Sequence, residues 1–194
     1  INCIAVIPRS QFIITGSRDK TIKIWDLQRR MEVHTLTGHT DWVNDLVVTQ
    51  DGSALISASR DHTIMIWDIH SGDCLARLSG HSGAVTKIAL FSDQQRLISS
   101  SADCSLKIWD LKKRVILGAL TGHHDVINEL AILPNQQQAV SASRDHSLKL
   151  WDLNTLKPLA SFYGDESFVS CLVFPDDRII AGDRAGRMHL LKLE

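Results

Sequence analysis

The feature that most constrains this fold is a repeat of 42 residues. Consecutive tryptophans in one series stand 42 residues apart, at Trp25, Trp67, Trp109 and Trp151. Glycine-histidine pairs keep the same spacing, at Gly38-His39, Gly80-His81 and Gly122-His123, and Gly164-Asp165 follows after one more step. Self-similarity at a period near 40 to 45 residues indicates one supersecondary unit stacked against copies of itself.

These glycines also divide the chain. Cutting before each of them gives three complete repeats with a partial piece at either end: residues 1–37, 38–79, 80–121, 122–163 and 164–194. We therefore treat residues 1–194 as one repeat domain rather than as several unrelated domains.

Within one repeat the sequence predicts four short strands, here lettered a to d. Residues 42–48 form an apolar-rich run that ends before the Asp51-Gly52 turn signal, and residues 54–57 form a second run. Residues 63–67 alternate with a period of two, and residues 74–78 supply the fourth strand. Sustained helical periodicity with caps does not occur, so the expected fold class is all-β. Because one such sheet cannot bury both faces, we expect sheets packed radially as blades, five of them, with the last incomplete.

Composition excludes several classes of protein. The chain is 44% hydrophobic and 22% charged, which is ordinary for a globular protein, and its net charge of -1 gives no basic excess for binding nucleic acid. It has no apolar run long enough to span a membrane. The four cysteines include no Cys-x-x-Cys pair, so neither a disulfide framework nor a zinc site is expected. Cysteine usage of this kind favours a reducing compartment, and we expect a cytoplasmic protein.

The repeat carries a recognisable signature. Strings ending at Trp25-Asp26, Trp109-Asp110 and Trp151-Asp152 read Ser-x-Asp-x-[Thr/Ser]-[Ile/Leu]-Lys-[Ile/Leu]-Trp-Asp. Together with the Gly-His pairs, they resemble the WD-repeat (WD40) β-propeller family over essentially the whole chain. A seven-bladed propeller would need about 294 residues at this period. The resemblance therefore implies part of a seven-bladed or larger propeller, with further blades upstream in the same protein.

Serine, histidine and aspartate recur beside each tryptophan, which raises the question of hydrolase chemistry. In a four-stranded meander, the d–a loop with the histidine and the b–c turn with the aspartate lie at the same end of a blade, where they can meet beside the indole. Such contacts would satisfy polar groups that are otherwise buried unpaired. The family resemblance implies structural tetrads, and an enzyme does not need three copies of one active site, so we expect no catalytic residue. The expected tetrads are His39, Ser57, Asp61 and Trp67; His81, Ser99, Asp103 and Trp109; and His123, Ser141, Asp145 and Trp151.

The last repeat departs from this pattern. Asp165, Ala181, Ala185 and Leu191 occupy its four tetrad places, and the sequence stops after the predicted strand c. We therefore expect this blade to lack strand d. The histidines show no metal-ligand spacing, and Gly182 and Gly186 lack the Lys-Ser/Thr of a phosphate-binding loop, so neither a metal nor another cofactor is expected.

Partners of the family commonly bind the face that carries the d–a loops and b–c turns. Four arginines precede or align with the b–c aspartate, and aromatic and amide side chains recur near the start of strand a. The resulting candidate set for partner binding is Arg18, Arg60, Arg144, Arg184, Trp42, Phe168, Asn44 and Asn128. Arginine with aromatic residues is typical of interface hot spots. The alternative is that the arginines pair with Asp41, Asp125 or Glu166 while Trp42 fills a gap between blades.

No catalytic constellation remains after these assignments, so we expect a non-catalytic scaffold or sensor that binds a protein or peptide. The ending Ala-Gly-Asp-x-x-Gly-x-x-His-x-Leu-x-Leu-Glu of residues 181–194 resembles C-terminal propellers of signalling NTPases of the NACHT and NB-ARC type. That likeness implies a domain of a larger signalling protein. The alternative is a propeller that recruits substrates to an enzyme complex, such as a ubiquitin ligase or a kinase.

Overall fold

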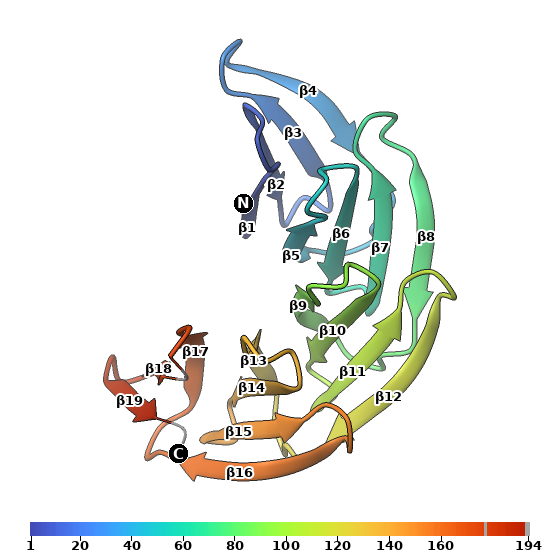
Figure 1. The fold of residues 1–194 in the computed structure, drawn as a ribbon. Coiled ribbons are helices and arrows are strands. Elements are labelled where there is room, and N and C mark those ends of the chain that lie inside the picture. The colour runs from blue at the N-terminus through green and yellow to red at the C-terminus, as the bar shows by residue number, and fades with distance from the viewer. Residues whose placement is uncertain (177, 193–194) are drawn as a thin grey trace. The chain divides into compact units, whose positions relative to one another are not determined.

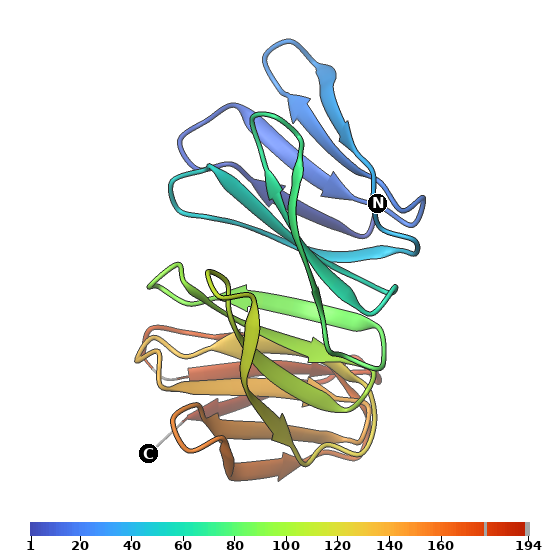
Figure 2. The same ribbon diagram turned by 90° about the vertical axis from the view of Figure 1, so that its right-hand side faces the viewer.

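The computed structural model describes residues 1–176 and 178–192, and within them the chain is all-β. The strands form five antiparallel sheets, one for each repeat, and four of these sheets have four strands while the fifth has three. Figures 1 and 2 show each sheet as a run of antiparallel arrows joined by short turns. The predicted fold class, with an incomplete last blade, is confirmed.

The chain divides into two compact units, Ile1–Leu90 and Phe91–Glu194. The first unit contains β1 (Cys3–Val6), β2 (Phe12–Gly16), β3 (Ile22–Asp26), β4 (Met31–Leu36), β5 (Val43–Val48), β6 (Ala54–Ser59), β7 (Thr63–Asp68), β8 (Cys74–Ser79) and β9 (Val85–Leu90). The second contains β10 (Arg96–Ser101), β11 (Ser105–Asp110), β12 (Val115–Thr121), β13 (Ile127–Ile132), β14 (Gln138–Ser143), β15 (Ser147–Asp152), β16 (Lys157–Tyr163), β17 (Phe168–Val173), β18 (Arg178–Asp183) and β19 (Met188–Lys192).

Strand order within a sheet follows chain order, as the meander predicts. The first unit holds the sheets β1-β2-β3-β4 and β5-β6-β7-β8, and the second holds β13-β14-β15-β16 and β17-β18-β19. The third repeat contributes β9 to the first unit and β10, β11 and β12 to the second. In the last sheet β19 is followed by no further strand in the described part of the chain, and its residues Met188 and Leu190 are 82% and 65% exposed.

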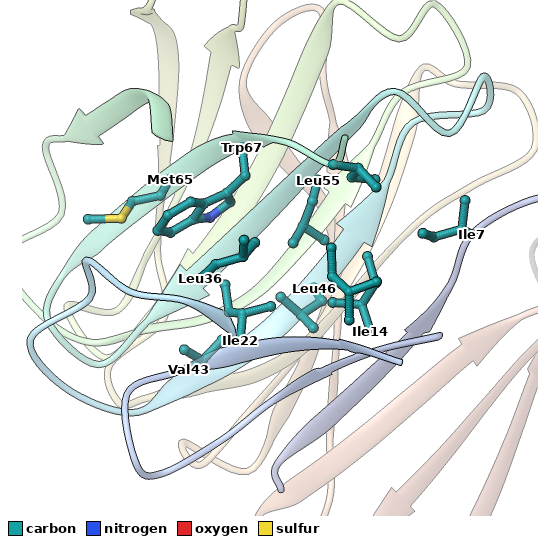
Figure 3. Close-up of a cluster of buried hydrophobic side chains, with 11 residues drawn as sticks. Ile7, Ile14, Ile22, Leu36, Val43, Leu46, Leu55, Met65 and Trp67 are labelled. Atoms are coloured by element: carbon teal, nitrogen blue, oxygen red, sulfur yellow. The ribbon is translucent and has the colours of Figure 1, made fainter. Parts of the chain in front are cut away.

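The core of the first unit lies between its first two sheets. Ile14, Ile22 and Leu36 come from the first sheet and pack with Val43, Leu46, Leu55 and Trp67 from the second. Figure 3 shows the indole of Trp67 next to Met65, with Leu36 close by. The equivalent core of the second unit joins Val140 and Leu148 of one sheet to Phe168, Cys171, Ile179 and Ala181 of the next. Neighbouring sheets thus bury the faces that one sheet alone would expose.

The aspartate of each Trp-Asp pair ends strand c. The Asp68 carboxylate accepts hydrogen bonds from the backbone amides of His70 (2.8 Å) and Ser71 (2.9 Å). Asp26 and Asp152 bind the amides two and three residues further on in the same way. Aspartate is favoured in turns because its side chain can satisfy these amides locally. The Trp-Asp pair therefore combines a core side chain with a turn former.

The b–c turns have a second repeated construction. Asp61 accepts hydrogen bonds from the Thr63 amide (3.0 Å) and hydroxyl (2.6 Å), and His62 between them has a left-handed φ of 71°. The corresponding residue of the last sheet is Gly186, with a φ of 82°, where glycine carries no steric penalty. This turn fixes the aspartate inward and leaves the preceding residue, Arg60, exposed at the tip.

Candidate functional site

The predicted tetrad of the second repeat is a closed hydrogen-bond network. Nδ1 of His39 lies 2.9 Å from Oδ2 of Asp61, and Nε2 lies 2.7 Å from the Ser57 hydroxyl. The Trp67 indole donates to the same hydroxyl at 2.8 Å. With Nδ1–H donated to Asp61, Nε2 is left to accept from Ser57. The d–a loop, β6, the b–c turn and β7 each supply one member, as the meander predicts.

The preceding glycine is what allows the loop to reach the indole. A Cβ at Gly38 would stand 3.0 Å from the Trp67 ring, which is tighter than nine in ten real Cβ contacts. Glycine therefore brings the chain close enough for His39 to enter the network. The glycine of the Gly-His pair thus packs closely against the tryptophan ring.

The fourth repeat has the same network at nearly the same distances. His123 lies 2.7 Å from both Asp145 and Ser141, and the Trp151 indole donates to Ser141 at 2.8 Å. In the third repeat Trp109 donates to Ser99 at 2.8 Å. In the first repeat Trp25 donates to Thr15 at 2.9 Å. The serine or threonine is therefore the constant partner of the indole.

Electrostatics hold these carboxyl groups ionised. Burial raises the pKa of Asp61, but hydrogen bonds from His39, Thr63 and the Thr40 amide outweigh it, so the pKa lies well below its ordinary value. The same balance lowers the pKa of Asp145 to about 2. Burial lowers the pKa of His123 despite its bond to Asp145.

Burial decides how the Ser, His and Asp groups can act. Ser57 and Ser141 are 0% exposed, and each hydroxyl accepts a bond from an indole. A nucleophile needs access to a substrate and a free lone pair for attack. No buried side-chain nitrogen or oxygen in residues 1–176 and 178–192 lacks a hydrogen-bond partner. The arrangement therefore supports blade packing and offers no open reaction centre.

The last sheet contains a polar cluster that the sequence analysis missed. The Asp183 carboxylate lies 3.0 Å from Nε2 of His189 and accepts the Arg187 amide at 2.9 Å. The Arg187 guanidinium also bonds Asp165 at 3.0 Å, and the His189 ring stands edge-on to Phe168 with centroids 5.1 Å apart. The bond to His189 lowers the pKa of Asp183. The sequence feature that could have identified this cluster is the pair Asp183 and His189. These residues stand six positions apart, where the fourth repeat has Ser143 and Lys149.

In the first unit, the candidate arginines flank Trp42. The guanidinium of Arg18 lies 4.4 Å from the indole centroid, and that of Arg60 lies 4.5 Å from it. Arg60 also lies 3.8 Å from the Asp41 carboxylate, and Nε of Arg18 donates to Asn2 at 3.2 Å. Trp42 is half-buried between two cations. This is the packing and pairing that the alternative interpretation of the arginines describes.

The candidate asparagines connect neighbouring sheets. The Asn44 amide donates to the Val85 carbonyl at 2.8 Å, and the Asn128 amide donates to the Phe168 carbonyl at 2.7 Å. Asn2 makes the same bond to Val43 at 3.1 Å. Each bond ties strand a of one blade to the start of strand a in the next. The amide nitrogens of Asn44 and Asn128 are therefore already engaged within the fold.

The expectation that Phe168 lies on the binding rim is wrong. Its side chain is 0% exposed and belongs to the core of the second unit. The register explains this difference, because Arg60 and Arg144 donate their amides to the carbonyls of Trp42 and Val126, whereas Arg184 donates to Ser167. The last d–a loop is one residue shorter than the others. Ser167 therefore occupies the position of Trp42.

A polar hollow of about 440 Å³ lies at this position in the second unit, lined by Asn128, Arg144, Ser167, Val169 and Arg184. Nε of Arg144 donates to Asn128 Oδ1 at 3.2 Å, as Arg18 does to Asn2. Neither Arg144 nor Arg184 forms an ion pair with any residue that the structure describes. The pairing expected for these arginines with Asp125 or Glu166 is thus not seen.

Other candidate features are few in the described residues. Among residues 1–176 and 178–192, His, Cys, Asp and Glu side chains form no group of three or more that could hold a metal ion. In that same part of the chain, we find no helix with the length and apolar character needed to cross a membrane. An apolar hollow of about 390 Å³ in the first unit is lined by side chains that include Ile7, Phe12, Ile24 and Ile69.

Comparison with known proteins matches both halves of the chain. The family described as "WD domain, G-beta repeat" matches residues 1–26, 30–68 and 72–110, which is more than half of the sequence. The family described as "TEP-1 C-terminal beta-propeller" matches residues 123–193. The two matches together reach from the first repeat into the last.

Individual relatives match over about one repeat. Nuclear distribution protein PAC1-2 of Postia placenta is 51% identical over 41 residues, which is 21% of this chain and 10% of that protein. Nuclear distribution protein PAC1 of Mycosarcoma maydis is 50% identical over 44 residues, 23% of this chain and 10% of that protein. Nuclear distribution protein nudF of Aspergillus terreus is 51% identical over 43 residues, which is 22% of this chain and 9% of that protein. The chain therefore spans about a tenth of the length of these relatives.

Proposed function

The chain belongs to the WD-repeat family, and from this premise we propose that it is a non-catalytic scaffold that recognises a protein or peptide. The observation that carries the proposal is the closure of the Ser-His-Asp networks. In the second and fourth repeats the serine is buried and hydrogen-bonded to an indole, so these groups stabilise the packing of the blade. What remains for function is the surface that the rigid sheets display.

We place the binding surface at the end of each sheet that carries the d–a loops and b–c turns. Arg18, Arg60, Arg144 and Arg184 are all exposed there. Trp42 adds an aromatic surface held by two of these cations. Arginine and tryptophan are the residues most often found at interface hot spots. The set proposed for binding is therefore these five residues with Asn44 and Asn128 as supports, and without Phe168.

Our finer proposal is a C-terminal sensor domain of a larger signalling protein, with further blades upstream. The match of residues 123–193 to a C-terminal propeller family supports it, because the same segment carries the ending that resembles propellers of NACHT and NB-ARC proteins. The similarity to nuclear distribution proteins covers a single repeat. It therefore supports membership of the repeat family and does not bear on the proposed sensor role. All four cysteines are unbridged, which supports the proposed cytoplasmic location.

Photo-cross-linking tests the proposed surface. A benzophenone side chain placed in the whole protein at Arg60 or Arg144 should cross-link a partner, whereas one at Lys112, in the c–d turn after β11, should not. The partner, identified by mass spectrometry, is then purified and titrated against the wild type and Arg60→Ala. Cross-linking confined to Lys112 would place the interface at the opposite turns. Recovery of a ubiquitin-ligase or kinase subunit would favour a substrate-recruiting propeller over a sensor domain.

A further inference from the structure

The hollow between Arg144 and Arg184 differs from its counterpart in the first unit at the place that Trp42 holds. There, Trp42 fills the space between Arg18 and Arg60. In the second unit the shorter loop puts Ser167 in that place, and a hollow of about 440 Å³ is present. The Ser167 hydroxyl points back into the fold and donates to the Arg144 carbonyl at 3.0 Å. A large aromatic filler has thus been replaced by a small residue that does not occupy the space.

The lining of this hollow carries positive charge without a counter-charge. Its two ionisable side chains are both arginines, and no aspartate or glutamate lines it. Arg144 is held by its Nε bond to Asn128, which leaves its terminal nitrogens free to bond a ligand. Asn128 is itself fixed by its bond to the Phe168 carbonyl. At least one of the two guanidinium groups is therefore already oriented before a ligand arrives.

Two acidic side chains of the last blade bond residues other than Arg184. Asp165 bonds Arg187, and Asp183 bonds both Arg187 and His189. Neither carboxylate forms an ion pair with Arg184. Paired guanidinium groups bind carboxylates through strong charge-assisted hydrogen bonds. Val169, which is 46% exposed, offers an apolar wall for the methylene carbons that precede such a carboxylate.

We propose that the hollow formed by Arg144, Ser167, Val169 and Arg184 binds the carboxylate of a glutamate or aspartate side chain on the partner protein. This inference rests on the proposed scaffold function and names the chemical group that one part of the surface recognises. Arg144 and Arg184 supply the charge, Asn128 orients Arg144, and Ser167 leaves the space open. The equivalent place in the first unit is closed by Trp42 and takes no such group.

The test is titration of the whole protein with a short fluorescent peptide of alternating glutamate and glycine, read by anisotropy at low salt. Arg184→Gln should weaken binding about tenfold, the effect of losing one charge-assisted hydrogen bond. Ser167→Trp should abolish binding by filling the hollow as Trp42 does. Lys112→Gln is the matched control, because it also removes one positive charge but from an exposed side chain in the c–d turn after β11, and it should leave the affinity unchanged.

Three results would overturn the proposal: equal weakening by Lys112→Gln, undiminished binding to Ser167→Trp, or equal binding of a lysine-glycine peptide. Binding of a phosphoserine-glycine peptide without binding of the glutamate peptide would also overturn it in favour of a phosphate site. Thermal melts confirm that each variant folds. If the glutamate peptide fails while Trp42→Ala abolishes capture of the purified partner, the scaffold function stands and the carboxylate site falls.

Discussion

The backbone amide of Arg184 donates a hydrogen bond to the carbonyl of Ser167 at 2.9 Å, and this bond marks the register in which β17 and β18 pair. Its counterpart in the second blade joins Arg60 to Trp42 at 2.8 Å. Ser167 therefore stands where the Trp42 indole stands three blades earlier, and Phe168 takes the core position of Val43. The same shift buries an aromatic ring and leaves the Arg144–Arg184 hollow unfilled.

Phe168→Ala should accordingly lower the free energy of unfolding by about 3 to 5 kcal/mol, the usual cost of deleting a buried phenyl ring. The reason is that Phe168 is 0% exposed and contacts the rings of Phe162 and His189. Urea denaturation measures the change. Ser167→Ala is the matched control and should change stability much less, since it removes a single hydroxyl bond. Wild-type stability of Phe168→Ala would contradict the register described here.

The sequence predicts most of this fold because the repeat is redundant. Strands, turns and tetrads of the second and fourth repeats follow from residue type and spacing, since Trp67 and Trp151 mark one core position and Asp61 and Asp145 mark one turn. The final d–a loop could not be predicted in the same way. Val169 and Leu172 fit strand a as well as Phe168 and Cys171 do, and a slip of one residue exchanges the two faces of a strand.

Only part of the candidate binding surface could be predicted from the sequence, for a related reason. Spacing identifies which arginines lie at the turn tips, but it does not say which of them find a partner. Arg60 lies beside the Asp41 carboxylate and the Trp42 ring. Arg184 has no acidic or aromatic partner among the described residues. That difference depends on the shortened loop and on Arg187, which engages both Asp165 and Asp183. Pairing in three dimensions therefore separates arginines that look equivalent in sequence.

Ser57→Ala should lower the free energy of unfolding by about 2 to 6 kcal/mol. The substitution removes the common partner of His39 and Trp67, so two buried polar groups lose a hydrogen bond at about 1 to 3 kcal/mol each. Ser71→Ala, in an exposed turn, is the control and should cost less than about 0.5 kcal/mol. Chemical denaturation checks both variants. A neutral Ser57→Ala would mean that the tetrad does not stabilise the blade.

Stability should fall with acid in two steps. His123 has a lowered pKa in the folded state, so the unfolded chain takes up a proton first and stability is lost as pH falls below the ordinary histidine value of about 6.5. The Asp145 pKa is lowered from 3.8 to about 2, so its contribution is present above the unfolded value and is lost between those two pH values. Melting temperatures across this range measure the effect. Asp145→Asn should flatten the lower step, and an unchanged profile would contradict the assignment.

Asn44→Ala should lower the free energy of unfolding by about 1 kcal/mol, because it leaves the Val85 carbonyl without its 2.8 Å bond between strands β5 and β9. Asn154→Ala in an exposed turn is the matched control and should have little effect. Denaturation curves with unchanged slopes would attribute the loss to the native state. If both asparagine variants behave alike, the bond between blades contributes nothing measurable.

Trp42→Ala should weaken binding of the identified partner by at least about 2 kcal/mol if Trp42 is a hot spot of the proposed surface. Its ring is half-buried, and the guanidinium groups of Arg18 and Arg60 lie 4.4 and 4.5 Å from the ring centroid. The side chain is therefore already held in place and loses little conformational freedom on binding. Trp42→Phe keeps an aromatic face for both cations and should retain most of the affinity, while the exposed Lys112→Ala should change it by almost nothing. Isothermal titration with the purified partner gives these values, with melting temperatures measured in parallel. A loss of stability without a loss of affinity would show that Trp42 fills a gap between blades, and the partner would then contact the arginines without it.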